Sequence, residues 1–246
     1  MVVERAGGDR AVRGACFRDR RDAGRRLGAA VQRYLARRPP DPGAAAIVIA
    51  LPRGGVLVGC EVARAIEAPL DIWVVRKIGA PGHEELGLGA VAEGGATYLS
   101  AEIVAVTKVS PADVAALIAR KTDEVARRTQ LLRGTRPAPV IESKLVILVD
   151  DGIATGGTIR AVARALRALR PKRLVLAVPI AACDTAQALA DEVDDVVCLE
   201  TPAVLHAVGA WYDDFRQVAD SEVVTILESA AKPTDEQVAK QSKGRS

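Results

Sequence analysis

Residues 146–158 read Val146-Ile147-Leu148-Val149-Asp150-Asp151-Gly152-Ile153-Ala154-Thr155-Gly156-Gly157-Thr158. The first four residues are apolar, as in a strand that is buried on both faces of a parallel sheet. Two aspartates stand at the end of this run, a short glycine-bearing loop follows, and apolar residues then recur at helical spacing from Ile159 to Leu169. The stretch therefore predicts a strand, a tight loop and a helix in direct succession.

The loop and the start of the predicted helix have the composition of a phosphate site. In parallel sheets, ligands bind at the carboxyl ends of the strands. A helix N-terminus offers unpaired N–H groups and a positive dipole end to an anion. Glycines let the backbone approach a phosphate closely, and threonine hydroxyls add donors. The residues expected to surround the phosphate are Ala154, Thr155, Gly156, Gly157 and Thr158.

Asp150 and Asp151 complement this phosphate site. Ionised carboxylates only accept hydrogen bonds, so they suit a vicinal diol, or a divalent cation bound to one. Hydrogen-bond donors for a phosphate, next to acceptors for a diol at the end of the same strand, are typical of a ribose 5-phosphate site. The alternative is a glycine-rich turn with two surface acids, which we disfavour because the acids adjoin a wholly apolar strand. A dehydrogenase is not indicated, because no GxGxxG follows a strand, and GxxxxGK[ST] does not occur either.

Outward from this stretch, short apolar runs alternate with helical patterns. Such alternation predicts an α/β fold with a central, mainly parallel sheet flanked by helices. A small hairpin is expected at 87–93 and 97–99, around Gly94-Gly95. The expected strands are 46–51, 70–75, 144–149, 174–178 and 196–199. The expected helices are 19–37, 56–66, 111–132, 158–169, 184–191 and 220–229.

Charge is distributed unevenly along the 246 residues. The formal net charge is +3, yet the first 38 residues contain 11 arginines and 4 acids. In one interpretation this basic stretch contacts nucleic acid or an anionic ligand. In the other, which we favour because charge runs alone are weak signals, it forms a solvated helix face. Aromatic residues make up 3% of the chain, which leaves little material for stacking nucleic-acid bases.

Further features bear on the compartment and the organisation of the chain. The four cysteines are not at metal-ligand spacing and are expected to be reduced. No apolar stretch reaches membrane-spanning length, and the N-terminal residues lack the apolar core of a signal peptide. The sequence thus predicts a cytoplasmic protein without a membrane partner. We expect a poorly ordered stretch 1–16, one domain over 17–229, and a disordered polar tail 230–246.

The stretch 146–158 resembles the signature with which type I phosphoribosyltransferases bind phosphoribosyl pyrophosphate (PRPP). Its part 154–158 is similar to the form found in adenine phosphoribosyltransferases. From about Phe17 to about Ser229, the chain looks most like a bacterial group of predicted phosphoribosyltransferases whose acceptor is generally unassigned. The resemblance implies the type I fold with a small hood that includes residues 206–220. It further implies a role in nucleotide metabolism, namely transfer of phosphoribose from PRPP to a nitrogenous base, with release of pyrophosphate. A homodimer is compatible with it.

Two further loops carry the resemblance. Leu51-Pro52-Arg53-Gly54-Gly55 resembles the family's pyrophosphate loop, where glycine N–H groups and the fork of Arg53 suit phosphate oxygens. Residues 76–85 match the catalytic loop in family position, and their glycines and proline predict a mobile segment. Arg76 and Lys77 would meet the pyrophosphate. The resemblance also implies Mg²⁺ at Asp150 and Asp151, through the diol or water, with those aspartates, Lys77 and Glu84 as the catalytic set.

The acceptor is less defined. Glu84 and Glu85 would meet the acceptor or magnesium-bound water, whereas His83 is as consistent with an ordinary loop residue as with a proton shuttle. Ala154 stands where some 6-oxopurine transferases have an aspartate, which argues against hypoxanthine or guanine. The candidate rings for stacking a flat acceptor, with core packing as the alternative, are Trp211, Tyr212 and Phe215.

A second function fits the same donor site. A regulator that keeps the fold would bind PRPP without turnover and would contact nucleic acid through the basic helix at 18–38. Release of pyrophosphate in the presence of an acceptor distinguishes the enzyme from the regulator.

Overall fold

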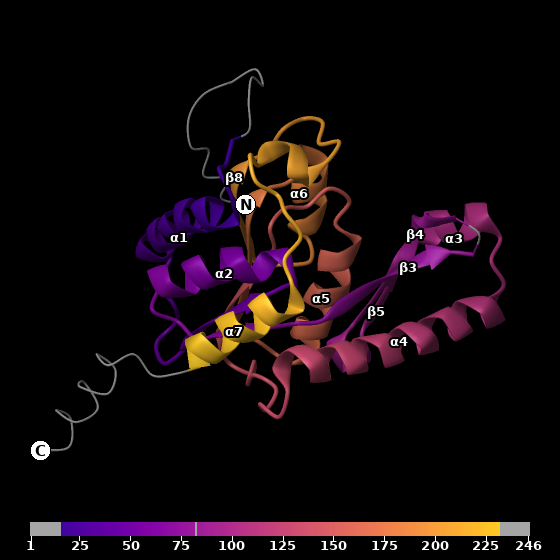
Figure 1. The fold of residues 1–246 in the computed structure, drawn as a ribbon, viewed down its shortest axis with the longest axis horizontal. Coiled ribbons are helices and arrows are strands. Elements are labelled where there is room, and N and C mark those ends of the chain that lie inside the picture. Colours follow the sequence, from indigo (N-terminus) through magenta and orange to yellow (C-terminus); the bar gives the residue numbers. More distant parts are fainter. Residues whose placement is uncertain (1–15, 82, 232–246) are drawn as a thin grey trace, which may run out of the picture.

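A computed structural model describes residues 16–81 and 83–231. Its centre is a five-stranded parallel sheet in the order β2-β1-β6-β7-β8 (Figure 1). The strands are β1 (Ala46–Ala50), β2 (Leu70–Ile72), β6 (Leu145–Val149), β7 (Arg173–Ile180) and β8 (Asp195–Glu200). The predicted fold class, an α/β fold with a central parallel sheet, is confirmed.

Strand β6 occupies the middle of the sheet, as its unbroken apolar sequence predicts. All five of its residues are buried. Val149, its last residue, is in register with Ala50 of β1 on one side and Ala177 of β7 on the other. The residues that follow β1 and β6 therefore emerge at the same edge of the sheet.

Helices cover both faces of this sheet and bury alternate strand residues. Ile147 and Val149 belong to a core shared with α1, α2 and α7, whereas Val146 and Leu148 belong to a core shared with α5 and α6. Figure 1 shows α1, α2 and α7 together, with α5 on the other side. The helices are α1 (Arg20–Arg37), α2 (Gly54–Ala65), α5 (Gly157–Ala168), α6 (Cys183–Leu189) and α7 (Asp220–Ala231).

A second sheet extends away from the first as an arm, supported by a long helix (Figure 1). The expected hairpin around Gly94-Gly95 is confirmed, because β4 and β5 pair antiparallel on either side of the 3-10 turn η1. Strand β3 pairs with the other side of β4. The arm comprises β3 (Val75–Ala80), β4 (His83–Ala92), η1 (Glu93–Gly95), β5 (Thr97–Leu99), α3 (Ala101–Thr107) and α4 (Pro111–Arg133).

The structure differs from the expectation at residues 70–86. The single strand expected at 70–75 is divided, since β2 ends at Ile72 and β3 begins at Val75. Residues 77–80 and 83–86, expected in a loop, have strand backbone, and 77–80 pair with residues 83–90 of β4. Buried Ile78 and Leu88 explain this, because they give the arm an apolar face of its own despite the glycines.

The predicted hood, residues 206–220, runs along the start of the domain. It contains the 3-10 turn η2 (Val208–Trp211), and the Trp211 carbonyl accepts hydrogen bonds from the N–H groups of Cys16 and Phe17. The expected ends of the domain fall partly outside the described residues, as 1–15 and 232–246 are not described. In the described part, no helix is both long enough and apolar enough to cross a membrane.

Candidate functional site

The stretch that follows β6 forms a cradle at the sheet edge. Gly156 has a φ of 74°, a conformation that favours glycine, and it turns the chain directly into α5. No described side chain caps the first turn of α5, so its first N–H groups have no side-chain acceptor, as an anion site requires. The loop is also held by α6, where the Thr185 hydroxyl donates to the Ala154 carbonyl at 2.8 Å.

The predicted pyrophosphate loop packs against the two aspartates. A Cβ atom on Gly54 would overlap Asp151 Oδ2, and one on Gly55 would lie 3.0 Å from Asp150 Oδ1. Gly54 therefore leaves no room for a side chain, and a side chain at Gly55 would need its neighbours to shift, because the backbone passes close to the carboxylates. The peptide between Pro52 and Arg53 is cis. The structure thus brings together two segments that lie about a hundred residues apart in the sequence.

A pocket of about 440 Å³ opens at this edge. It collects residues from the pyrophosphate loop, from β3, from α4 and from the cradle, and four of the predicted site residues line it, namely Arg76, Lys77, Asp150 and Thr158. The residues that line it are Leu51, Pro52, Val75, Arg76, Lys77, Glu124, Asp150 and Thr158. Lys77 also lines a neighbouring cavity of about 500 Å³ between β3 and α4.

Asp150 carries a carboxyl group in an unfavourable environment. Burial raises its pKa well above the ordinary value, and the negative charge of Asp151 raises it further, while Lys77 acts in the opposite direction. The N–H of Asp151 donates to Asp150 Oδ1 at 2.9 Å. A group that would gain from a cationic or hydrogen-bond-donating ligand thus lines the pocket.

Asp151 is held by a buried arginine of α1. Burial raises the pKa of Asp151, and Arg20 counteracts this effect by donating from Nε to Asp151 Oδ2 at 2.6 Å. Arg20 is 8% exposed and also donates to the Arg216 carbonyl at 2.9 Å. Its guanidinium lies over the Phe215 ring, 3.7 Å from the ring centroid.

The aromatic rings of the hood are largely engaged within the protein. Tyr212 is 5% exposed, its ring lies 5.2 Å from that of Phe17 and 4.9 Å from that of Phe215, and its hydroxyl donates to the Asp151 carbonyl at 2.6 Å. Trp211 is half-buried. The packing alternative therefore fits Tyr212 better than stacking on an acceptor, because its ring is not accessible.

The cations of the candidate pyrophosphate site have protein carboxylates as partners. Arg76 Nε lies 2.6 Å from Glu124 Oε1, and Lys121 donates to the other oxygen of Glu124 at 2.7 Å. These charges, that of Lys121 most, lower the pKa of Glu124. On the other side, Arg53 lies 3.9 Å from Asp220. Glu124 thus pairs closely with Arg76, whereas Asp220 is bound mainly by Arg128 and only approaches Arg53.

Comparison with known proteins agrees with this arrangement. A family model described as the phosphoribosyl transferase domain matches residues 22–213. The chain belongs to the phosphoribosyl transferase family. The matched region contains the pyrophosphate loop, the cradle and Trp211–Tyr212 of the hood.

Two curated relatives of the chain carry names that specify no acceptor. Two curated proteins of Mycobacterium tuberculosis, from strains CDC 1551 / Oshkosh and ATCC 25618 / H37Rv, are named provisionally as phosphoribosyl transferases. Each is 41% identical to this chain over 214 residues, which are 87% of this chain and 47% of the relative. The chain therefore spans about half the length of the curated relatives it matches.

A solved structure shares the fold. The crystal structure of TT1426 from Thermus thermophilus is 39% identical to this chain, with a TM-score of 0.73. The alignment covers 88% of this chain and 99% of that chain. The parallel sheet with its antiparallel arm is thus the type I phosphoribosyltransferase fold, as expected.

A divalent cation fits this candidate site only together with a ligand. Among the described residues, no three His, Cys, Asp or Glu side chains form a metal-binding group. Mg²⁺, however, is commonly bound by one or two carboxylates together with substrate phosphates. Asp150, whose pKa is raised by burial and by the adjacent negative charge, has the chemistry for the protein's share of such a site.

The sequence analysis missed two residues of the site. Arg20 lies on the buried face of α1, together with Ala23, Leu27 and Val31. A charged residue within this apolar stripe of the sequence could have indicated a buried ion pair. Glu124 gave no such signal, because the residues one helical turn away, Arg120, Lys121, Arg127 and Arg128, are also charged. Of the catalytic set, Glu84 has its backbone in β4, and its side chain lies outside the described part.

Proposed function

We propose that this protein transfers the 5-phosphoribosyl group from PRPP to a nitrogenous base or a similar acceptor and releases pyrophosphate. The pocket of about 440 Å³ carries the proposal, because Asp150 and Thr158 of the cradle line it together with Lys77 and Pro52. Diol acceptors, anion donors and a cation gather there from separate parts of the chain. Membership of the phosphoribosyl transferase family supports the same function.

The donor would bind along the edge of the sheet. Its 5-phosphate would accept hydrogen bonds at the start of α5, where the backbone N–H groups and two hydroxyls lie. Asp150 would accept hydrogen bonds from the ribose diol. The residues proposed for the 5-phosphate are Ala154, Thr155, Gly156, Gly157 and Thr158.

The pyrophosphate group would bind between the pyrophosphate loop and β3. Gly54 and Gly55 would offer N–H groups, while Arg53 and Arg76 would exchange their carboxylate partners Asp220 and Glu124 for phosphate oxygens. A diphosphate carries more charge than a single carboxylate, so this exchange favours the ligand.

The proposed reaction is a displacement at C1 of the ribose. The nitrogen lone pair forms the bond to C1, the bond from C1 to the pyrophosphate oxygen breaks, and its electron pair leaves with pyrophosphate. Where the acceptor nitrogen carries a proton, that proton passes to solvent. Lys77 and Arg53 would stabilise the charge that develops on the leaving group. Asp150 would hold the sugar in line with the acceptor.

Mg²⁺ and the acceptor complete the proposal. Asp150 would contribute to holding Mg²⁺, which when bound supplies charge neutralisation for the pyrophosphate. Glu84 would meet the acceptor or a magnesium-bound water. Of the three aromatic candidates, we retain Trp211 for stacking, because the rings of Tyr212 and Phe215 are packed against protein groups.

The test is release of pyrophosphate from PRPP and Mg²⁺ in a screen of purine, pyrimidine and other nitrogen acceptors. We expect release with at least one acceptor and none without it. Binding of PRPP with no release for any acceptor would instead support the regulator. In that case, salt-sensitive binding of nucleic acid that is lost when arginines of α1 are neutralised would be the second observation.

A further inference from the structure

The two adjacent aspartates of the cradle have different surroundings. Of the pair, Asp150 lines the pocket of about 440 Å³, and Asp151 is not among the described residues that line it. The side chain of Asp151 is 16% exposed, and its Oδ2 receives the hydrogen bond of Arg20. Two neighbouring carboxylates with the same chemistry are thus directed at different partners.

Arg20 has little freedom to release Asp151. Its side chain is 9% exposed and bound in three ways: by Asp151, by the Arg216 carbonyl and by the face of Phe215. A guanidinium is planar and holds its donors in a fixed fork, so these contacts determine its orientation. The main chain of Asp151 is also held, through the Tyr212 hydroxyl.

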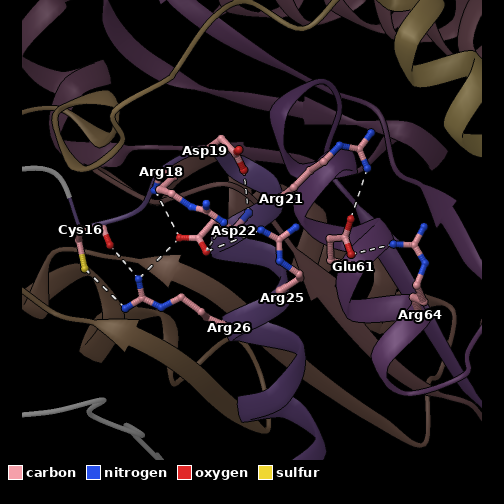
Figure 2. A network of polar contacts seen from close by, with 9 residues as sticks. All are labelled: Cys16, Arg18, Asp19, Arg21, Asp22, Arg25, Arg26, Glu61 and Arg64. Atoms are coloured by element: carbon pink, nitrogen blue, oxygen red, sulfur yellow. Dashed lines mark hydrogen bonds and ion pairs between the residues drawn. The ribbon is translucent and has the colours of Figure 1, made fainter.

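The first turn of α1 is itself anchored on its outer side (Figure 2). The Asp19 side chain accepts the N–H of Asp22 at 2.7 Å, which caps the helix. Arg21 donates to Glu61 of α2 at 3.3 Å, and Glu61 also accepts from Arg64. Arg20 is thus a buried residue of this capped turn, whereas Arg21 beside it is partly exposed and contacts α2.

The ion pair lies directly beneath the pyrophosphate loop. A Cβ atom on Gly54 would overlap Asp151 Oδ2 and would lie 2.7 Å from Arg20 Nε. Gly55 makes the corresponding approach to Asp150. The Arg20–Asp151 pair is thus the surface on which Gly54 rests, and this loop is the proposed pyrophosphate site.

We propose that Asp151 is a positioning residue: held by Arg20, it fixes the loop 52–55 where that loop binds pyrophosphate and leaves the ribose diol to Asp150. The inference rests on the proposed function for the identity of the two ligand halves. Asp150 then serves the ribose diol and Asp151 the pyrophosphate, although the sequence suggested that both aspartates bind the diol.

The test separates the two halves of the donor. Ribose 5-phosphate and magnesium pyrophosphate are titrated calorimetrically against the full chain and its variants. We expect Asp150→Asn to weaken the binding of ribose 5-phosphate about tenfold or more. We expect Asp151→Asn and Arg20→Met to weaken the binding of pyrophosphate by about tenfold. The same variants should change the affinity for ribose 5-phosphate less than about twofold. Equal weakening of ribose 5-phosphate by Asp150→Asn and Asp151→Asn would overturn the proposal.

Coupling between the partners gives a stricter readout. The double variant Arg20→Met with Asp151→Asn should weaken pyrophosphate no more than either single variant, because both changes break the same interaction. Arg20→Lys, which keeps the charge, should recover part of the affinity. Arg21→Met is the matched control, since it removes a charge from the same turn. The affinity of this variant for both ligands should stay within about twofold of the wild-type value. Additive losses in the double variant would contradict a shared role.

Failure of the proposed function remains distinguishable from failure of this inference. If wild type binds neither PRPP nor its halves, the proposed function fails, and amide hydrogen exchange of the unliganded protein decides the inference. The reporter is the N–H of Val56, which donates to the Arg53 carbonyl at 3.1 Å. Its exchange should be faster in Arg20→Met, or in the double variant if the single variant does not fold, than in Arg21→Met. Equal exchange would refute positioning by Arg20.

Discussion

A pair of adjacent aspartates lies at each end of the parallel sheet. Asp150 and Asp151 follow β6 at the carboxyl end, whereas Asp194 and Asp195 stand at the start of β8 at the amino end. Asp194 accepts two hydrogen bonds from Arg167 and one from the N–H of Leu174, and its pKa is lowered by these donors, although burial acts against them.

The second member of the amino-end pair is also fully engaged. Asp195 is 6% exposed, and its oxygens accept hydrogen bonds from Arg38 at 2.7 Å and from the Tyr34 hydroxyl at 2.8 Å. At the carboxyl end, by contrast, burial and the neighbouring charge raise the pKa of Asp150. The same dipeptide thus stabilises one end of the sheet and supplies an under-compensated carboxylate at the other, where a ligand can bind.

The largest expected difference between the pairs concerns PRPP. Asp150→Asn should raise the dissociation constant of PRPP by roughly 30- to 100-fold, since a charged acceptor is lost from the diol at a cost of about 2–3 kcal/mol. Titration calorimetry with Mg²⁺ measures this. Asp194→Asn is the matched change at the amino end and should leave the affinity within about twofold. Equal losses in both variants would remove the functional distinction between the pairs.

A smaller effect is expected on the stability of the amino end. Asp195→Ala should lower the free energy of unfolding by about 2 kcal/mol, because the buried Tyr34 hydroxyl loses its acceptor. Arg38 contributes less to this cost since it is half-exposed and remains solvated. Urea unfolding provides the measurement, and Asp123→Ala on the exposed face of α4 is the control. A loss below about 0.5 kcal/mol would show that the hydrogen bonds of Asp195 are replaceable by water.

Stability should change in the opposite direction at the carboxyl end. Asp150→Asn should increase the free energy of unfolding near neutral pH by about 1 kcal/mol, because the amide carries no charge to bury and does not repel Asp151. The measurement is urea unfolding of metal-free protein without ligand. If this variant is less stable than wild type, the carboxylate of Asp150 is better compensated than its surroundings indicate.

The pH dependence of stability should differ in sign between Asp150 and Asp194. The folded pKa of Asp150 is raised, so its stabilising contribution is complete below its ordinary pKa and is lost as pH rises through the folded value. The folded pKa of Asp194 is lowered, so its contribution is present above the ordinary value and is lost as pH falls through the folded one.

This sign difference is measurable by unfolding each variant across a pH series from acid to neutral. The advantage of Asp150→Asn over wild type should grow as pH rises, whereas the deficit of Asp194→Asn should shrink as pH falls. For Asp194→Asn we expect the free energy of unfolding to fall by about 0.5 kcal/mol. The effect is small because more than a third of the Asp194 side chain is exposed and solvent screens its ion pair with Arg167. Parallel pH profiles of the two variants would contradict the comparison.

Much of the parallel sheet was predictable because its signals are local. An apolar run with glycines after it marks β6 and α5, and Ser110 with Pro111 marks the start of α4, where the Ser110 side chain accepts the N–H of Asp113. The arm was predicted only in part. Glycine and proline around residue 80 suggested a loop, but pairing with residues 87–92 is a non-local interaction that no short window contains.

The candidate site divides in the same way. The cradle and the pyrophosphate loop each follow a strand and were recognisable by spacing and residue type. Arg20 could be suspected only as a charge on an apolar stripe, and its partner Asp151 lies 131 positions away. The inaccessible ring of Tyr212 was not predictable either, because aromatic residues suit packing and stacking equally well.

The contact between Arg20 and the Arg216 carbonyl spans 196 positions, almost the whole described chain. During synthesis, the first turn of α1 leaves the ribosome long before residue 216 is added. Closing so long a loop has an entropic cost that must be met before the contact stabilises anything. A nascent chain that contains β1, β6 and the cradle already has both Arg20 and Asp151, but it still lacks the Arg216 carbonyl that helps to orient Arg20 beneath the proposed pyrophosphate loop.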